Sequence, residues 1–176
     1  TGGNIIIGEI GGTSVETVTL DAGTGTTSVG VIGSGTEIGT LSIGSVENGG
    51  ITLNGAITTD GVITIDGPIT LATAAITITT ADDNINLQGT VDGGKALTLA
   101  SGSGAVTVDG AIGSSTALTS LTVNSSGTGT IEITNIGTTS DKVTFDTYLD
   151  LDITGEILFS AQAKGEASSG EAKICL

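Results

Sequence analysis

Residues 62–71 read VITIDGPITL, and this stretch decides the fold class. Its apolar residues alternate with threonine and aspartate on both sides of a Gly-Pro step. Period-two alternation of β-branched residues is typical of strands that bury one face. The same unit of strand, glycine-containing step and strand recurs as ITLNGAI at residues 51–57 and as INLQGTV at residues 85–91. The sequence therefore predicts short β-strands joined by tight corners.

The composition supports an ordered all-β chain with an aliphatic core. The 176 residues include 30 Gly but only one Pro, two Phe, one Tyr and no Trp, Met or His. Disordered chains are poor in apolar and β-branched residues, whereas 37% of this chain is hydrophobic. Ile, Val, Leu and Ala must therefore fill the interior.

A longer tandem repeat, with a period of about 80 residues, runs through the chain. Residues 18–25 (VTLDAGTG) match residues 97–104 (LTLASGSG), and residues 32–43 (IGSGTEIGTLSI) match residues 112–123 (IGSSTALTSLTV). The same offset continues where Thr64 pairs with Thr144 and Asp66 with Asp146. We therefore expect one repeat over residues 1–83, a second over residues 84–163, and a linker or junction over residues 164–176.

Two architectures fit tandem β repeats: a parallel β-helix or β-solenoid, and tandem β-sandwiches. Sandwiches favour a buried Trp or Tyr and long strands, whereas a narrow solenoid takes stacked aliphatic residues with glycine at its corners. Asp-Gly pairs at residues 60–61, 66–67, 92–93 and 109–110 tolerate the positive φ of tight turns. The solenoid is therefore the predicted fold, with coils of about 20 residues stacked about 4.8 Å apart and roughly four coils per repeat.

The last part of the chain differs from the rest. Residues 143–163 hold all three aromatic side chains, Phe145, Tyr148 and Phe159, together with several acids. Terminal repeats of solenoids are often atypical because they cover an exposed end of the core. We expect residues 143–163 to form a cap or a junction with a neighbouring subunit. Cys175 is the only cysteine, so no intrachain disulfide is possible.

The charge balance excludes two classes of partner. The formal net charge is -15, with 19 acidic residues and four lysines. Nucleic acids and anionic membrane surfaces both attract basic proteins, so neither is an expected partner. No apolar stretch reaches the roughly 18 residues of a membrane helix, so no membrane insertion is expected. The chain also lacks an initiator Met and a signal segment at its start, which predicts a mature or excised fragment.

The residues offer little for catalysis or for a cofactor. Without His or Arg, acid–base chemistry would depend on carboxylate pairs such as Asp82 with Asp83, or Asp150 with Asp152. Asp82 and Asp83, as neighbours in a strand, would point to opposite faces, whereas Asp150 and Asp152 would share one face. Solvent-exposed positions on the surface account for both pairs without a catalytic role. We therefore predict no enzyme and no catalytic, cofactor-binding or metal residues. Calcium is the one possible cofactor, at Asp82-Asp83-Asn84 or at the cluster of Asp146, Asp150 and Asp152, although no EF-hand loop or calcium nonapeptide is present.

Pairs of threonine residues raise ice binding as a further class of function. Thr-x-Thr occurs at residues 24–26, 77–79 and 128–130. An ice-binding surface would need such pairs on one flat face at every coil, and this spacing is irregular. Threonine is also a favoured strand residue.

Residues 102–123 (GSGAVTVDGAIGSSTALTSLTV) and 54–71 (NGAITTDGVITIDGPITL) resemble the repeats of giant bacterial surface proteins of the filamentous-haemagglutinin kind. That resemblance implies a right-handed parallel β-helix, export to the cell surface, and a role in adhesion or filament formation. The expected function is an extracellular structural or adhesive repeat: a stalk segment of a surface adhesin, or a subunit of a surface filament or sheath. Its expected partners are identical or neighbouring repeats joined end to end, and cell-surface or matrix ligands. The alternative is a module that binds a carbohydrate, a host surface or ice.

Overall fold

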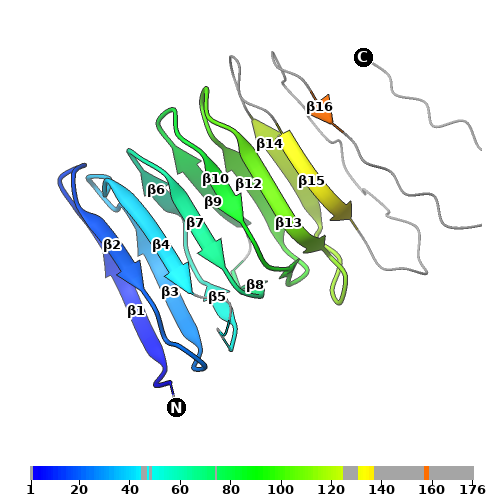
Figure 1. The fold of residues 1–176 in the computed structure, drawn as a ribbon, viewed down its shortest axis with the longest axis horizontal. Helices are drawn as coiled ribbons and strands as arrows, with labels where there is room; N and C mark the ends of the chain where they lie inside the picture. Colours follow the sequence, from blue (N-terminus) through cyan, green and yellow to red (C-terminus); the bar gives the residue numbers. More distant parts are fainter. Residues whose placement is uncertain are drawn as a thin grey trace, which may run out of the picture.

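The chain forms a β-solenoid in which every pair of neighbouring strands is parallel. The computed structural model describes residues 2–44, 47, 49–73, 75–124, 131–136 and 157–158. These residues form sixteen short strands and no helix, and the strands follow one another along the long axis of the molecule (Figure 1). The predicted parallel solenoid is confirmed, and the antiparallel pairing of tandem sandwiches is not found in the described part.

The strands make three parallel stacks, which we call A, B and C. Stack A contains β2 (Thr17–Leu20), β4 (Thr40–Gly44), β7 (Ile63–Asp66), β10 (Ile85–Leu87), β13 (Val106–Ile112), β15 (Ile131–Ile136) and β16 (Ile157–Leu158). Stack B contains β1 (Ile5–Ile10), β3 (Thr27–Ile32), β5 (Ile51–Leu53), β8 (Ile69–Leu71) and β11 (Val91–Asp92). Stack C contains β6 (Ile57–Thr59), β9 (Ala75–Thr80), β12 (Ala96–Ala100) and β14 (Ser120–Asn124).

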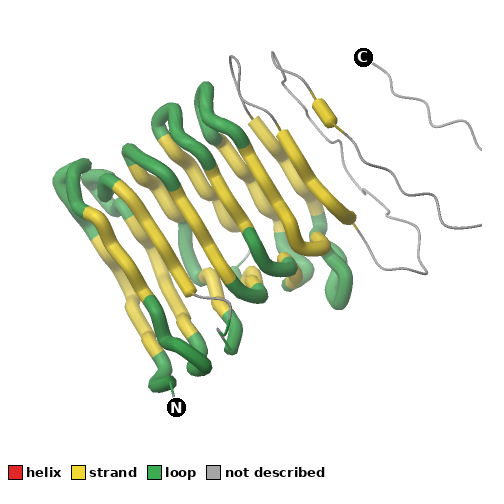
Figure 2. Tube along the Cα trace, viewed as in Figure 1, coloured by secondary structure: helices red, strands yellow, loops and turns green. Residues whose placement is uncertain are grey.

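Two of the longer strands pass around a corner and join neighbouring stacks. The first residues of β3 pair with β5 and its last residue, Ile32, pairs with Ile57 of β6. In β13 the register shifts between Val108 and Ala111, after which Ile112 pairs with Val91 of β11. Loops connect the other strands at the ends of the stacks (Figure 2). Each coil therefore passes through stacks A, B and C in turn.

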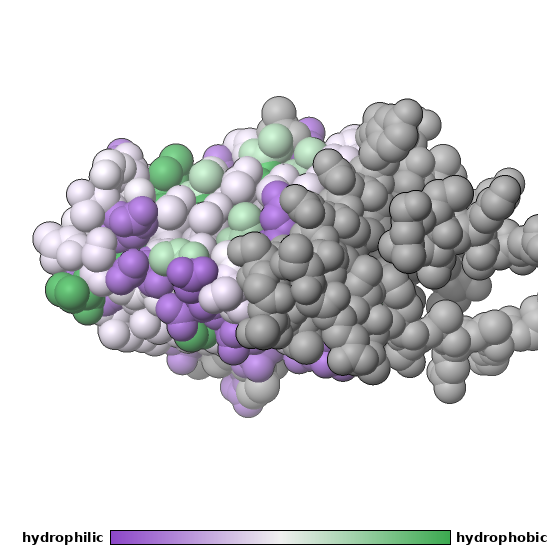
Figure 3. Space-filling model, turned by 90° about the horizontal axis from the view of Figure 1, so that it is seen from above, coloured by the Kyte–Doolittle hydropathy of each residue, from purple (hydrophilic) through white to green (hydrophobic). Residues whose placement is uncertain are grey.

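Aliphatic side chains stack in register to form the core. Leu41, Ile63, Ile85 and Val106 occupy equivalent places in four successive coils of stack A, and each is fully buried. The residue between the two inward positions of each strand points outward, which gives a ladder of Ser42, Thr64, Asn86 and Thr107. This is the arrangement that the alternating pattern predicts. Seen from above, the described surface is mostly pale or purple, with isolated apolar patches (Figure 3).

All four Asp-Gly pairs lie at corners, as predicted. Only two of the four glycines have the positive φ that the sequence analysis gave as the reason. Gly67 and Gly93 have positive φ values of 136° and 134°. Gly61 and Gly110 do not, and glycine is needed there because the coils approach closely. A Cβ at Gly110 would lie 2.2 Å from the carbonyl carbon of Gly89 in the preceding coil. Close packing between coils thus requires glycine at Gly61 and Gly110, where the turn conformation does not.

The sequence repeat does not contain a whole number of coils. Stack A passes from Leu41 to Ile63 in one coil and from Ile63 to Ile85 in the next. A repeat of about 80 residues therefore holds fewer than the four coils expected. Val18 lies in β2 of stack A, whereas its counterpart Leu97 lies in β12 of stack C. Equivalent segments thus occupy different faces of the solenoid.

Parallel pairing continues across residues 83 and 84, because β7 pairs with β10 and β9 with β12. The division into residues 1–83 and 84–163 therefore stays a prediction about the repeat in the sequence. Apart from β16, the predicted cap at residues 143–163, the junction at residues 164–176 and Cys175 lie outside the described residues.

Candidate functional site

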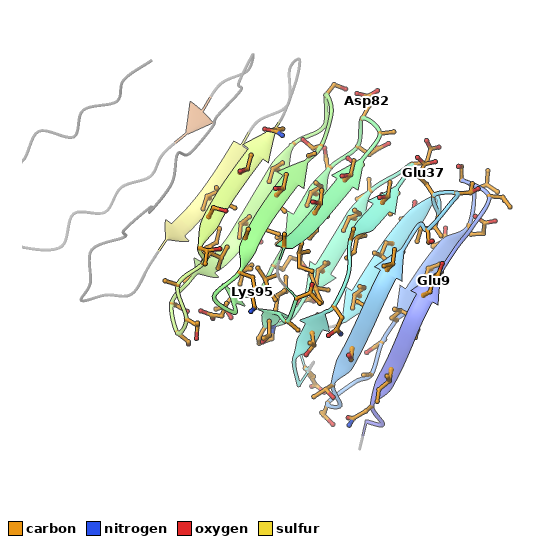
Figure 4. All side chains as sticks on the ribbon, turned by 180° about the vertical axis from the view of Figure 1, so that it is seen from behind. Glu9, Glu37, Asp82 and Lys95 are labelled. Carbon is orange, nitrogen blue, oxygen red and sulfur yellow. The ribbon has the colours of Figure 1, made fainter. Side chains whose placement is uncertain are left out.

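The acidic side chains of the described part are dispersed rather than gathered. Glu9 lies on β1, Glu37 in the loop before β4, and Asp82 in the loop after β9, while Lys95 lies just before β12 (Figure 4). In the part of the chain that the structure describes, no group of three or more His, Cys, Asp or Glu side chains could hold a metal ion. Calcium binding therefore stays a prediction.

The candidate at Asp82-Asp83-Asn84 lies at the corner between stacks C and A, and two of its side chains bond to the next coil. Asp82 Oδ1 accepts a hydrogen bond from the backbone N–H of Ser103 at 2.9 Å. Asn84 Oδ1 accepts one from the N–H of Ala105 at 2.8 Å. These oxygens therefore link one coil to the next. The second candidate, Asp146, Asp150 and Asp152, lies outside the described residues.

Corner side chains link neighbouring coils elsewhere too, which the sequence analysis missed. Asn4 Oδ1 accepts a hydrogen bond from the N–H of Thr26 at 3.0 Å, so it has in the first repeat the role that Asn84 has in the second. Asp92 Oδ1 accepts hydrogen bonds from the N–H groups of Ser115 at 2.7 Å and Thr116 at 2.9 Å. The repeat offset of 80 residues places Asn4-Ile5 opposite Asn84-Ile85 in the sequence, and this match was the one sign that Asn4 and Asn84 have the same role.

The carboxyl group of Glu16 has a clearly lowered pKa. Its side chain accepts hydrogen bonds from the hydroxyl and from the backbone N–H of Thr13, the latter at 2.7 Å. These bonds, led by the one from the hydroxyl, stabilise the carboxylate and lower the pKa of Glu16 from 4.5 to about 2. The interaction orders the loop between β1 and β2 and brings no second acid or base to Glu16.

The threonine pairs do not form a regular two-column surface in the described part. Thr77, Thr98 and Thr122 make one outward column on stack C. The neighbouring column contains Thr79 but continues with Ala100 and then Asn124. The pair at residues 24–26 lies at a corner, where Thr24 Oγ1 accepts a hydrogen bond from the N–H of Gly2, and residues 128–130 lie outside the described residues.

The first coil presents a surface of a different kind, which we call the N-terminal edge. It consists of the sides of β1 and β2 that face away from β3 and β4. It also includes five inward-facing apolar residues, Ile5, Ile7, Ile10, Val18 and Leu20. Among the described residues β1 pairs only with β3, and β2 only with β4. One side of each strand therefore has backbone groups directed away from the stack.

The apolar side chains of the N-terminal edge are only partly buried, and of these Ile7, Ile10, Val18 and Leu20 pack against the core. Their equivalents one coil further along, Val29, Ile32, Leu41 and Ile43, are 0–1% exposed. The difference arises because the later coil is covered on both sides and the first on one side. The N-terminal edge is therefore the strongest candidate for a binding surface in the described part.

Comparisons with known proteins do not supply a family for this chain: no family model, no curated protein and no solved structure matches it. No helix of the described residues is long and apolar enough to cross a membrane.

Proposed function

We propose that this chain is an extracellular structural repeat without catalytic activity, which serves as a stalk segment of a surface adhesin or as a subunit of a surface filament or sheath. The observation that carries the proposal is the unbroken aliphatic column from Leu41 through Ile63 and Ile85 to Val106. Such a column joins successive coils into one body that extends along a single axis. A rigid extended body suits a spacer or a fibre.

The polar side chains of the described part support the same proposal. Asp82, Asn84 and Asp92 bond to backbone N–H groups of the following coil, so these potential ligands or acids already have a role in the fold. The high negative charge keeps an extended surface soluble and opposes nonspecific aggregation. The resemblance to bacterial surface repeats in residues 54–71 and 102–123 suggests the cell surface as the location.

Immunogold electron microscopy of intact source cells tests this proposal. Antibodies raised against the purified chain should label fibres, a sheath or the outer surface without permeabilisation. The control is the same antibody after absorption with the purified chain, which should remove the label. Gold that appears only inside permeabilised cells would contradict an extracellular structural role.

A further inference from the structure

Glycines at one corner distinguish the N-terminal edge from the coils that follow it. Gly8, Gly30 and Gly55 follow one another in successive coils at the corner between stacks B and C. A Cβ at Gly30 would lie 1.9 Å from the carbonyl oxygen of Gly8, and one at Gly55 would lie 2.8 Å from the carbonyl carbon of Gly30. Each glycine thus makes room for the coil before it. A Cβ at Gly8 would meet no atom within 4 Å, so the contacts of the described chain do not require glycine there.

The internal repeat shows what covers an equivalent surface elsewhere in the chain. The counterparts of β1 and β2 in the second repeat are β10 and β12. Within the chain, β7 covers β10 and β9 covers β12, so that Ile63 pairs with Ile85 and Ile78 with Leu99. The N-terminal edge therefore matches a surface that residues 63–80 already cover.

Residues 143–151 are the counterpart of residues 63–71, and they keep the pattern of that earlier segment. The inward aliphatic residues among residues 63–71 all have apolar residues at the matching positions of the later segment, whereas further along the buried Ile76 corresponds to Glu156. Ile63, Ile65, Ile69 and Leu71 correspond to Val143, Phe145, Leu149 and Leu151. The outward Thr64 and Asp66 are repeated as Thr144 and Asp146. The chain thus carries near one end a sequence suited to the surface at its other end.

We propose that β1 in the N-terminal edge binds a second copy of this chain, whose residues 143–151 add to β1 in parallel. Val143 of one copy would then adjoin Ile5 of the next as Ile63 adjoins Ile85. This interface joins two different surfaces, so it does not close on itself and generates a filament. The proposal rests on the structural role given above and names its partner.

Electron microscopy of the purified wild-type chain gives the first test. The net charge of -15 opposes contact between copies at low salt, so assembly should increase with ionic strength. Two repeats of about 80 residues, with coils of about 22 residues at a spacing of about 4.8 Å, give an axial rise of roughly 35 Å per copy. Filaments with this rise support head-to-tail stacking, whereas a monomer at all protein and salt concentrations overturns it.

Gly8→Ala tests the surface itself. The added methyl group has open space within one chain, so far-UV circular dichroism and the melting temperature should stay at wild-type values. In the filament it would strike the backbone of the docked copy, as a Cβ at Gly30 would strike Gly8, and assembly should be lost. Ile6→Thr is the matched control, because Ile6 is 82% exposed and lies beside the outward Ser28 of β3. A folded Gly8→Ala chain that forms filaments like wild type overturns the proposal.

A mixing experiment tests the direction of assembly. Phe145→Asp places a charge in the docking segment, at the position that matches the buried Ile65 in the sequence, and leaves the N-terminal edge unchanged. The Gly8→Ala and Phe145→Asp chains should each sediment as monomers, and an equimolar mixture should form dimers and stop there. Dimers of Phe145→Asp alone would indicate contact between two N-terminal edges and would overturn the head-to-tail arrangement.

The two proposals fail separately. Surface labelling of source cells together with a strictly monomeric purified chain would refute stacking and leave the structural role in place. Filaments of the purified chain together with purely intracellular labelling would refute the extracellular role and leave stacking in place.

Discussion

At the residue scale, one buried hydroxyl in the described part of the chain lacks the hydrogen-bond partner that the other buried hydroxyls have. Thr27 is fully buried between Ile5 and Ile51 in stack B, and its Oγ1 has no hydrogen-bond partner. Thr59 is also buried, but its hydroxyl donates a hydrogen bond to the carbonyl of Gly61. A buried polar group without a partner costs roughly 1–3 kcal/mol of stability.

Thr27→Val should therefore stabilise the fold by about 1 kcal/mol, because valine has the same shape without the hydroxyl. The matched change Thr59→Val removes a bonded hydroxyl and should destabilise by a similar amount. Urea unfolding of the wild-type and variant chains measures both effects. A loss of stability in Thr27→Val would show that its hydroxyl has a partner in solution.

In the loop between β1 and β2, the hydrogen bonds from Thr13 to the carboxylate of Glu16 make a contribution to stability that depends on pH. The pKa of Glu16 is lowered to about 2 by hydrogen bonds from the hydroxyl and N–H of Thr13. A folded pKa below the unfolded value means that the stabilisation is fully present above about pH 4.5 and is lost as the pH falls through about 2. Carbon-13 NMR of the Glu16 carboxyl group should give a midpoint near 2 in wild type and a higher one in Thr13→Ala. A midpoint near 4.5 in wild type would contradict this hydrogen bonding.

At the scale of the element, the corner between stacks B and C limits the side chains that β3 can carry. A Cβ at Gly30 would lie 1.9 Å from a backbone oxygen that cannot move without disturbing β1. Gly30→Ala should therefore destabilise the fold by about 1–3 kcal/mol, the usual cost of overpacking. Gly8→Ala is the control with open space, and thermal unfolding compares the two. Equal melting temperatures would show that the coils are further apart at this corner than the structure places them.

The strands themselves were predictable from the sequence, whereas their division among three faces was not. Alternation marks Ile63 and Ile65 as inward and Thr64 as outward, because each residue of a strand reverses direction. The glycine-containing step at Asn54 and Gly55 predicts a corner, but nothing local shows that this corner joins stacks B and C, since that is fixed by the pairing of β3 with both β5 and β6. The roles of Asn84 and Asp92 were equally hidden, because their partners lie one coil away in the sequence.

At the scale of the whole molecule, the length of the sequence repeat is not a multiple of the length of one coil, so the repeat does not correspond to a structural unit of the solenoid. Because the repeat does not contain a whole number of coils, it carries each segment onto a different face, as Val18 in stack A and Leu97 in stack C show. The three faces must therefore accept similar strands, which explains why the chain uses one uniform pattern of aliphatic and threonine residues. The sequence revealed the repeat, but only the strand pairing shows this rotation.

The central claim is that residues 63–66 pair in parallel with residues 85–87 of the next coil, and disulfide cross-linking tests it most directly. In a chain with Cys175→Ser, Thr64→Cys and Asn86→Cys would be outward neighbours on adjacent strands, about 4.8 Å apart, which is within disulfide range. This pair should oxidise readily in the folded chain and not in urea. A β-sandwich hairpin turning at residues 66–68 would instead bring Thr64 opposite Thr70. Efficient cross-linking of Thr64→Cys with Thr70→Cys, and none with Asn86→Cys, would contradict the solenoid.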